Sequence, residues 1–186
     1  MGKAVLISIR PYWCKLIAEE MKTIEIRKTR PKIDTPFKCY IYCSKTKENE
    51  PFMLQTRDSH DFTCGKTYRA TSGGEIIGEF TCDRIFPIRA LRNGPYSEER
   101  GEDYDEEYSS YGYNDCLTDE EFDSYLKGEN GYGWHISKLK VYFAQKPLSE
   151  FWSWNTGVVF EDGFPMPTHE ITRPPQSWCY VEEGET

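Results

Sequence analysis

The alternation of apolar and polar residues predicts a chain built mostly from short strands. Residues 3–9 form an apolar run that is typical of a buried strand, and residues 37–43 alternate as a half-buried strand does. Residues 67–70 and 75–88 read as two more strands. The four residues between them, Thr71 to Gly74, predict a hairpin turn.

The last third of the chain continues this pattern, with one irregularity. A strand begins near Gly133, but its apolar phase moves from Trp134 and Ile136 to Leu139 and the alternate residues that follow. This slip predicts a bulge near Ser137-Lys138, a kind of kink that closes small barrels. Residues 173–177 read as a rigid turn that leads into a final strand.

Two helices are expected. Pro11 suits a first helical turn, and apolar residues recur at helical spacing up to Met21, which predicts an amphipathic helix over about 11–21 with Trp13 in the core. Thr118 and Glu121 form a capping box. It opens a second helix that runs to about Lys127, where Gly128 ends it.

These elements predict an α+β fold that is predominantly β: a compact, barrel-like domain of about six strands, with a helix after the first strand and a short late helix. The length of 186 residues and the lack of a visible repeat or linker favour a single domain over 1–186. Three stretches read as irregular insertions in it, at about 44–63, 94–117 and 152–170.

Residues 20–28 carry the most informative chemistry. Strand alternation places Thr23, Glu25 and Arg27 on one face and two isoleucines on the other. With Lys22 they form a group that can bind a polar planar ligand through charge-assisted hydrogen bonds, or carry acid–base chemistry if the lysine is desolvated. The alternative is that these charges are solvated on the outer face of a strand.

The charge distribution narrows the possible ligands. The net charge of −8 argues against a protein that coats nucleic acid through bulk electrostatics. Residues 1–50 nevertheless carry 11 Lys and Arg against 6 Asp and Glu, whereas residues 94–131 carry 2 against 13. A basic surface near the 20–28 stretch can therefore coexist with an acidic insertion.

The early apolar run is too short for a signal sequence or a membrane span, so we expect a cytoplasmic protein with no membrane partner. The seven cysteines include no C-x-x-C pair and are expected to be reduced and mostly buried. Cys39 and Cys43 would lie about 13 Å apart on one strand, too far to chelate one zinc ion. The three histidines have no partners at ligand spacing, so we expect neither a metal nor another cofactor.

Several of these residues resemble a known family. An Ile-Arg-Pro-x-Trp helix start followed by Glu20-x-Lys22-Thr23-x-Glu25-x-Arg27 is similar to the ASCH domain, a branch of the PUA-like superfamily. The family motif is G-x-K-x-x-E-x-R, with Glu20 here in place of the glycine. The segments 132–136 and 173–178 also look like parts of bacterial or phage ASCH proteins.

The resemblance implies a PUA-like pseudobarrel with a cleft lined by the motif, and a family role in binding RNA or nucleotides. Lys22 and Arg27 would contact phosphate or carbonyl oxygens and Glu25 would accept a hydrogen bond from an exocyclic amine. An aromatic side chain, Trp134 or Tyr42, would stack on the base. Further candidates for the cleft wall or its rim are Glu79, His135, Arg173 and Gln176.

Two alternatives stay open. Some small ASCH proteins are amidohydrolases that deacetylate acetylated cytidine with a lysine, a threonine three residues later and a distant glutamate. Here Glu25 stands at the threonine position, so Lys22 as base and Thr23 or a water as nucleophile would be the catalytic groups. No residue matches the distant glutamate by motif, and Glu79 is a guess from its position alone. The other alternative is a protein partner bound by the acidic, tyrosine-rich segment 94–117.

Overall fold

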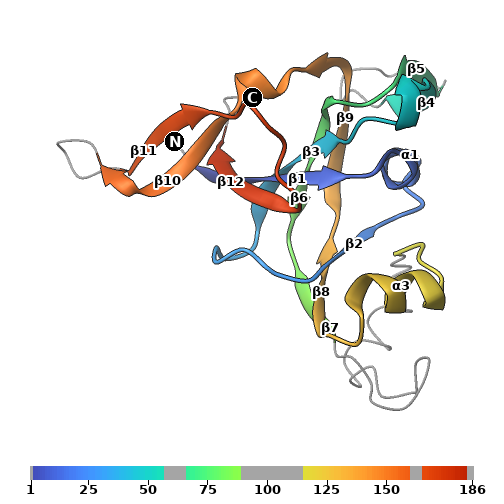
Figure 1. Ribbon diagram of the computed structural model, residues 1–186, viewed down its shortest axis with the longest axis horizontal. Coiled ribbons are helices and arrows are strands. Elements are labelled where there is room, and N and C mark those ends of the chain that lie inside the picture. Colours follow the sequence, from blue (N-terminus) through green and yellow to red (C-terminus); the bar gives the residue numbers. More distant parts are fainter. Residues whose placement is uncertain (1, 57–65, 89–114, 160–164, 184–186) are drawn as a thin grey trace.

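The computed structural model of the chain describes residues 2–56, 66–88, 115–159 and 165–183 (Figure 1). These residues form one large sheet, two small sheets and two α-helices. In spatial order, the large sheet consists of β11 (Pro165–Glu170), β10 (Trp152–Val159), β12 (Trp178–Glu182), β1 (Lys3–Ile9), β3 (Phe37–Cys43), β6 (Glu75–Cys82) and β9 (Ser137–Lys146).

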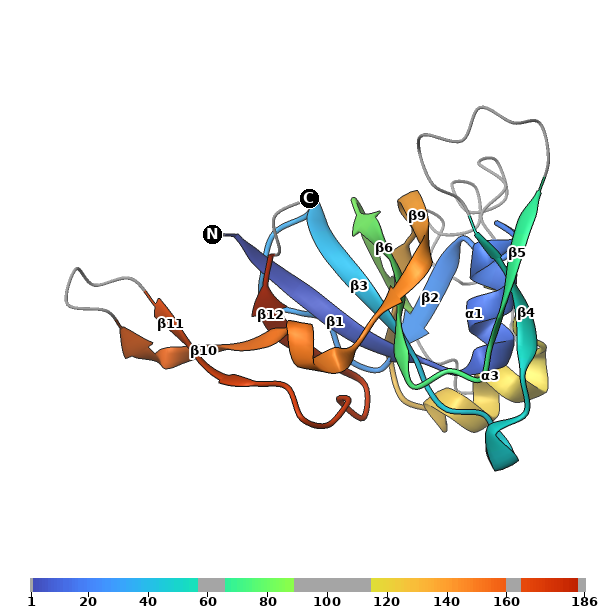
Figure 2. The same cartoon turned by 90° about the horizontal axis from the view of Figure 1, so that it is seen from above.

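The smaller elements surround one end of this sheet. A three-stranded sheet consists of β2 (Ile24–Arg27), β8 (Gly131–His135) and β7 (Ile85–Ile88), and a two-stranded ribbon consists of β4 (Phe52–Thr56) and β5 (Thr67–Thr71). The helices are α1 (Pro11–Ala18) and α3 (Asp119–Leu126), and two short 3₁₀ turns span Lys47–Asn49 and Leu148–Glu150. Figure 2 shows α1 between β2 and the β4–β5 ribbon, and both views show the β10–β11 hairpin reaching away from the other strands.

Strand β1 is the centre of the large sheet. It pairs parallel with β3 and antiparallel with β12, and α1 and β2 make the crossover that a parallel pair requires. Four successive residues, Ala4 to Ile7, are fully buried because side chains from both faces of β1 enter apolar clusters. Strand β3 is also buried on both faces, whereas its alternation had predicted a half-buried strand.

Both helices begin where their sequences predict, and α3 also ends where its sequence predicts. Pro11 occupies the first turn of α1, although the helix ends at Ala18, three residues earlier than expected. Glu20 follows it with a φ of 58°, in the left-handed region that favours glycine. Thr118 and Glu121 form the predicted capping box at α3, and Lys127 and Gly128 end that helix with positive φ angles.

The predominantly β α+β fold is confirmed, with a helix after the first strand and a late helix. The strand count in the described part exceeds the expected six because insertions contain strands and expected strands divide. Residues 44–63 contain β4 and residues 152–170 contain the β10–β11 hairpin. The strand expected over 75–88 breaks into β6 and β7, and the strand expected from Gly133 breaks into β8 and β9. The described strands form three separate sheets rather than one closed barrel.

The predicted hairpin across residues 71–74 is wrong. Strand β5 pairs with β4, and β6 pairs with β3 and β9. Gly73 and Gly74 do make the turn with φ of 75° and 88°, but the turn carries the chain from the ribbon to the large sheet. The bulge predicted near Ser137-Lys138 is confirmed, because the β6–β9 register shifts there and Lys138 has a φ of 48°.

Most of the acidic segment expected over 94–117 lies outside the described residues, which resume at position 115. No helix in the described part of the chain is both long and apolar enough to span a membrane. Of the six cysteines in that part, four are buried and two are half-buried, and all are free thiols, as predicted.

Candidate functional site

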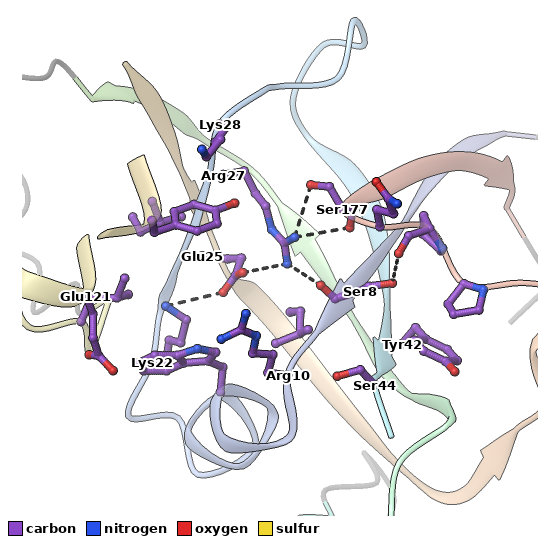
Figure 3. Close-up of a pocket in the computed structure, with 18 of the residues that line it drawn as sticks. Ser8, Arg10, Lys22, Glu25, Arg27, Lys28, Tyr42, Ser44, Glu121 and Ser177 are labelled. Carbon is purple, nitrogen blue, oxygen red and sulfur yellow. Dashed lines mark hydrogen bonds and ion pairs between the residues drawn. The ribbon is translucent and has the colours of Figure 1, made fainter. Parts of the chain in front are cut away.

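The charged residues of the 20–28 stretch are buried together. Lys22, Glu25 and Arg27 are 2%, 6% and 6% exposed. One carboxylate oxygen of Glu25 lies 2.8 Å from an Arg27 nitrogen and the other lies 3.5 Å from Lys22 Nζ (Figure 3). The alternative of a solvated strand face is therefore wrong, and we call these three residues the triad.

Backbone carbonyls complete the polar environment of the triad. Arg27 donates to the carbonyl of Ser8 over 2.6 Å and to the carbonyl and hydroxyl of Ser177 over 3.4 and 3.3 Å. Lys22 donates to the carbonyl of Asp115 over 2.5 Å. The triad thus joins β2 to β1, to the turn before β12 and to the segment before α3, which explains how three charges are tolerated in a buried position.

Above the triad lies a cavity of about 730 Å³. Its walls come from the β1–α1 junction, β2, the end of β3, α3 and the turn before β12. The lining residues are Ser8, Ile9, Arg10, Trp13, Lys22, Glu25, Ile26, Arg27, Lys28, Tyr42, Ser44, Leu117, Glu121, Ser124, Tyr125, Lys127, Pro174, Pro175, Gln176 and Ser177.

The cavity is positively charged although the chain is acidic. Five of its described lining residues are basic and two are acidic, whereas the whole chain has a net charge of −8. Three of the basic residues, Arg10, Lys28 and Lys127, are exposed at the surface of the protein. The local excess of positive charge favours an anionic ligand.

Three aromatic side chains line the cavity. Trp13 packs partly against the main core, as its helical spacing predicted, but it also lines the cavity, and Lys22 Nζ lies 5.1 Å from the centre of its ring. Burial raises the pKa of Tyr42, and it raises that of Tyr125 against the opposing effect of Arg27. Both phenols are therefore neutral at physiological pH and can donate a hydrogen bond.

Four of the residues predicted from the sequence meet at this cavity: Lys22, Glu25, Arg27 and Tyr42. Gln176, predicted at the rim, also lines it, whereas Arg173 does not. Thr23 is adjacent to the triad in sequence but is not among the lining residues, and its carbonyl accepts from the backbone of Ile136.

Three other predicted residues lie elsewhere. Trp134 is fully buried in the core with its ring near Phe37 and Trp178, so it has no surface on which a ligand can stack. His135 pairs with Asp83 at 2.6 Å, outside the lining of the cavity.

Glu79 belongs to a separate polar cluster on the large sheet. It accepts a hydrogen bond from Tyr142 over 2.5 Å, and Lys38 Nζ lies 4.0 Å away. The register pairs Glu79 with Tyr40 and Lys140, and Glu79 is not among the residues that line the cavity.

Sequence reasoning missed several functional lining residues, among them Arg10, Tyr125, Lys127 and, as more than a core residue, Trp13. Arg10 and Trp13 stand in the Ile-Arg-Pro-x-Trp segment that supported the family resemblance, which was the available signal. Tyr125 lies in α3 and Lys127 directly follows it, and the position of this helix against β2 depends on contacts distant in sequence. Among the described residues, no group of three His, Cys, Asp or Glu side chains could hold a metal ion.

This geometry defines a predominantly β protein with a basic, aromatic cleft beside a buried Lys–Glu–Arg triad. Its fold is that of the ASCH domain. A crystal structure of the ASCH protein of Zymomonas mobilis matches with a TM-score of 0.54 and 16% identity over 97% of this chain and 88% of that chain. Crystal structures of two mutant proteins of the same ASCH protein give TM-scores of 0.54 and 0.55 at 15% and 16% identity, over 97% and 98% of this chain and 89% and 92% of those chains.

No protein-family model and no curated protein sequence matches the chain. The structural likeness at this identity establishes the fold, and the function has to be argued from the cavity itself.

Proposed function

We propose that the cavity binds a nucleobase-containing ligand: a nucleotide, a modified nucleobase or an RNA segment. The observation that carries the proposal is the combination, in one cavity, of a buried Lys22–Glu25–Arg27 floor, an excess of positive charge and three aromatic side chains. Each feature corresponds to one part of such a ligand.

The size and the aromatic walls fit a base. A volume of about 730 Å³ lies within the range of roughly 300–1,000 Å³ that is usual for small-molecule sites. Trp13, Tyr42 and Tyr125 offer rings on which a base can stack, and one such contact contributes about 1–3 kcal/mol. Hydrogen-bonding groups for the edge of a base are present in Ser44 and Gln176.

The triad supplies a fixed polar floor. Its groups are held by backbone carbonyls and by each other, so they do not have to reorganise when a ligand enters. Binding sites that are organised in advance lose less entropy on association. The floor therefore favours a ligand with polar edges over an apolar one of the same size.

The proposal is tested by a panel of nucleosides, nucleotides and fluorescently labelled short RNAs, measured by calorimetry and anisotropy. Lys22→Met and Trp13→Leu should each weaken the binding of those panel members that the wild-type protein binds. Circular dichroism checks that each variant is folded. Lys47→Ala is the matched control, because Lys47 is exposed and outside the cavity. Absence of binding across the whole panel, or equal losses for Lys47→Ala, would contradict the proposal.

The two alternatives have less support among the described residues. Of the groups named for the amidohydrolase alternative, Lys22 lines the cavity, whereas Thr23 and Glu79 do not. The protein-partner alternative relies on a segment that lies mostly outside the described part of the chain.

A further inference from the structure

We infer that Arg10 is the phosphate-binding residue of this cavity, so that its ligand is a nucleoside phosphate, free or at the end of an RNA, rather than a neutral nucleoside or base. The inference rests on the proposed function and names the ligand class more narrowly. It concerns a residue outside the K-T-x-E-x-R stretch.

The terminal nitrogens of the triad's cations are already committed to protein groups, and only Arg27 Nε, which is buried, lacks a partner among the described residues. Lys22 is paired with Glu25 and bonded to the carbonyl of Asp115, and Arg27 is paired with Glu25 and bonded to Ser8 and Ser177. Less than a tenth of either side chain is exposed. A phosphate that recruited them would have to break these buried contacts, which is costly for charged groups.

Arg10 is different in both respects. It is exposed, it lines the cavity, and its guanidinium makes no hydrogen bond or ion pair with any described residue. Figure 3 shows this guanidinium inside the cavity, between the Lys22–Glu25 side and the Ser8–Ser44 side. It therefore offers its donors without loss of an existing contact.

The backbone at Arg10 is held in place from both sides. Arg10 directly follows β1, its carbonyl accepts the first backbone bond of α1 from Cys14, and Pro11 restricts it to the extended conformation observed, with φ −71° and ψ 150°. The side chain thus starts from a rigid position at the edge of the cavity. A guanidinium so placed can bind phosphate with two parallel hydrogen bonds, which an ammonium cannot do.

Two further cations face the same space. Lys28 Nζ lies 5.6 Å above the Tyr125 ring and Lys127 follows α3, and both are exposed. The exposed carboxylate of the lining, Glu121, accepts the hydrogen bond from the Thr118 amide in the capping box. Burial raises the pKa of Tyr125 in α3, and the positive charge of Arg10 is one of those that lower it in part. The charge of Arg10 is therefore felt on the α3 side of the cavity.

The experiment compares cytidine and adenosine with their 5′-monophosphates, and a short RNA carrying a 5′-hydroxyl with the same RNA carrying a 5′-phosphate. Wild type should bind the phosphorylated member of each pair more tightly, with a preference that declines as salt is raised. The free monophosphates and the RNA pair distinguish the two sources of phosphate. Lys15→Gln, an exposed cation of α1 outside the cavity, is the matched control.

Arg10→Gln should lower the affinity for the phosphorylated probes by about 10- to 100-fold and leave nucleoside affinity unchanged. Arg10→Lys should recover only part of the loss because it restores charge but not the forked geometry. Equal affinity of wild type for nucleosides and monophosphates, or equal losses for Arg10→Gln and Lys15→Gln, overturns the inference while the proposed function stands. Failure of every probe to bind wild type overturns both.

Discussion

Glu25 is the position at which the structure makes its strongest quantitative prediction. Its carboxylate is the counter-charge for two cations, at 2.8 Å from Arg27 and 3.5 Å from Lys22, and all three residues are more than nine-tenths buried. Glu25→Ala leaves both cations in place with backbone carbonyls but no anion. Removing one partner from a buried ion pair costs about 3–5 kcal/mol.

A loss of this size is large beside the total stability of a domain, which is about 5–15 kcal/mol. It corresponds to a fall of roughly 2–4 °C in Tm for each kcal/mol in a protein of this length. Urea unfolding followed by tryptophan fluorescence gives the free energy of unfolding directly. Glu129→Ala, which removes an exposed carboxylate after α3, should change it by less than about 0.5 kcal/mol.

A triple variant separates lost charge balance from lost packing. Lys22→Met, Glu25→Leu and Arg27→Met together replace the triad with apolar side chains of similar length, and such replacements are often neutral or stabilising. We expect the triple variant to be more stable than Glu25→Ala. If Glu25→Ala costs less than about 1 kcal/mol, or the triple variant is the less stable of the two, the triad is not a charge-balanced unit and the reasoning fails.

Three more predictions concern residues outside the lining of the cavity. Glu20→Gly should raise the free energy of unfolding by up to about 1 kcal/mol in urea titrations, because glycine adopts the φ of 58° found at Glu20 without steric strain. A lower free energy of unfolding would show that the Glu20 side chain stabilises the fold by more than its backbone strain costs. Thr118→Ala removes the cap of α3 and should cost about 0.5–2 kcal/mol, with Ser as the variant that restores it. Burial raises the pKa of Cys82 from 9.0 to about 12. The folded protein therefore keeps this thiol protonated at pH values where the unfolded chain loses the proton. The resulting contribution to the free energy of unfolding is complete below pH 9 and falls by about 1.4 kcal/mol per pH unit as the pH rises toward 12. Unfolding measured from pH 8 to 10.5 should therefore show a shallower decline for Cys82→Ala than for wild type, and identical slopes would contradict this account.

Local patterns predicted those elements whose determinants are local. The apolar run of β1, the helical spacing and Pro11 of α1, and the capping box of α3 all lie within the elements that they specify. The hairpin at residues 71–74 failed for the opposite reason. A Gly-Gly turn specifies a reversal of the chain but not the partner of the next strand, and β4 competes for β5 from a stretch that had no clear pattern.

The sequence predicted which residues form the centre of the site, but it did not predict that their side chains are buried. Alternation and the family resemblance singled out Lys22, Glu25 and Arg27, but the groups that make their burial possible stand at positions 8, 115 and 177. No window of sequence around residue 25 contains them. Single-strand reasoning consequently could not decide between a solvated face and a buried one.

Trp134 shows a related limit. It pairs directly with Glu25 in the β2–β8 register, so it does lie beside the triad, as the cleft hypothesis required. Its ring nevertheless enters the core beside Phe37 and Trp178. Cross-strand pairing sets which residues are neighbours, whereas exposure depends on what covers them, and here that cover comes from β3 and β12.

Residues that build the cavity and residues that meet the ligand call for different tests. Because the triad ties β1, β2 and the segment before α3 together, a substitution within it changes stability and binding at once, and the two effects cannot be assigned from affinity alone. Arg10 is exposed and bonded to no described side chain, so its removal changes the charge of the cavity without releasing a buried partner. Variants of Arg10 should therefore alter affinity with less than about 0.5 kcal/mol of lost stability, whereas variants of Glu25 should lose both. This contrast, measured by unfolding and binding on the same samples, separates the residues that build the cavity from the one that meets the ligand.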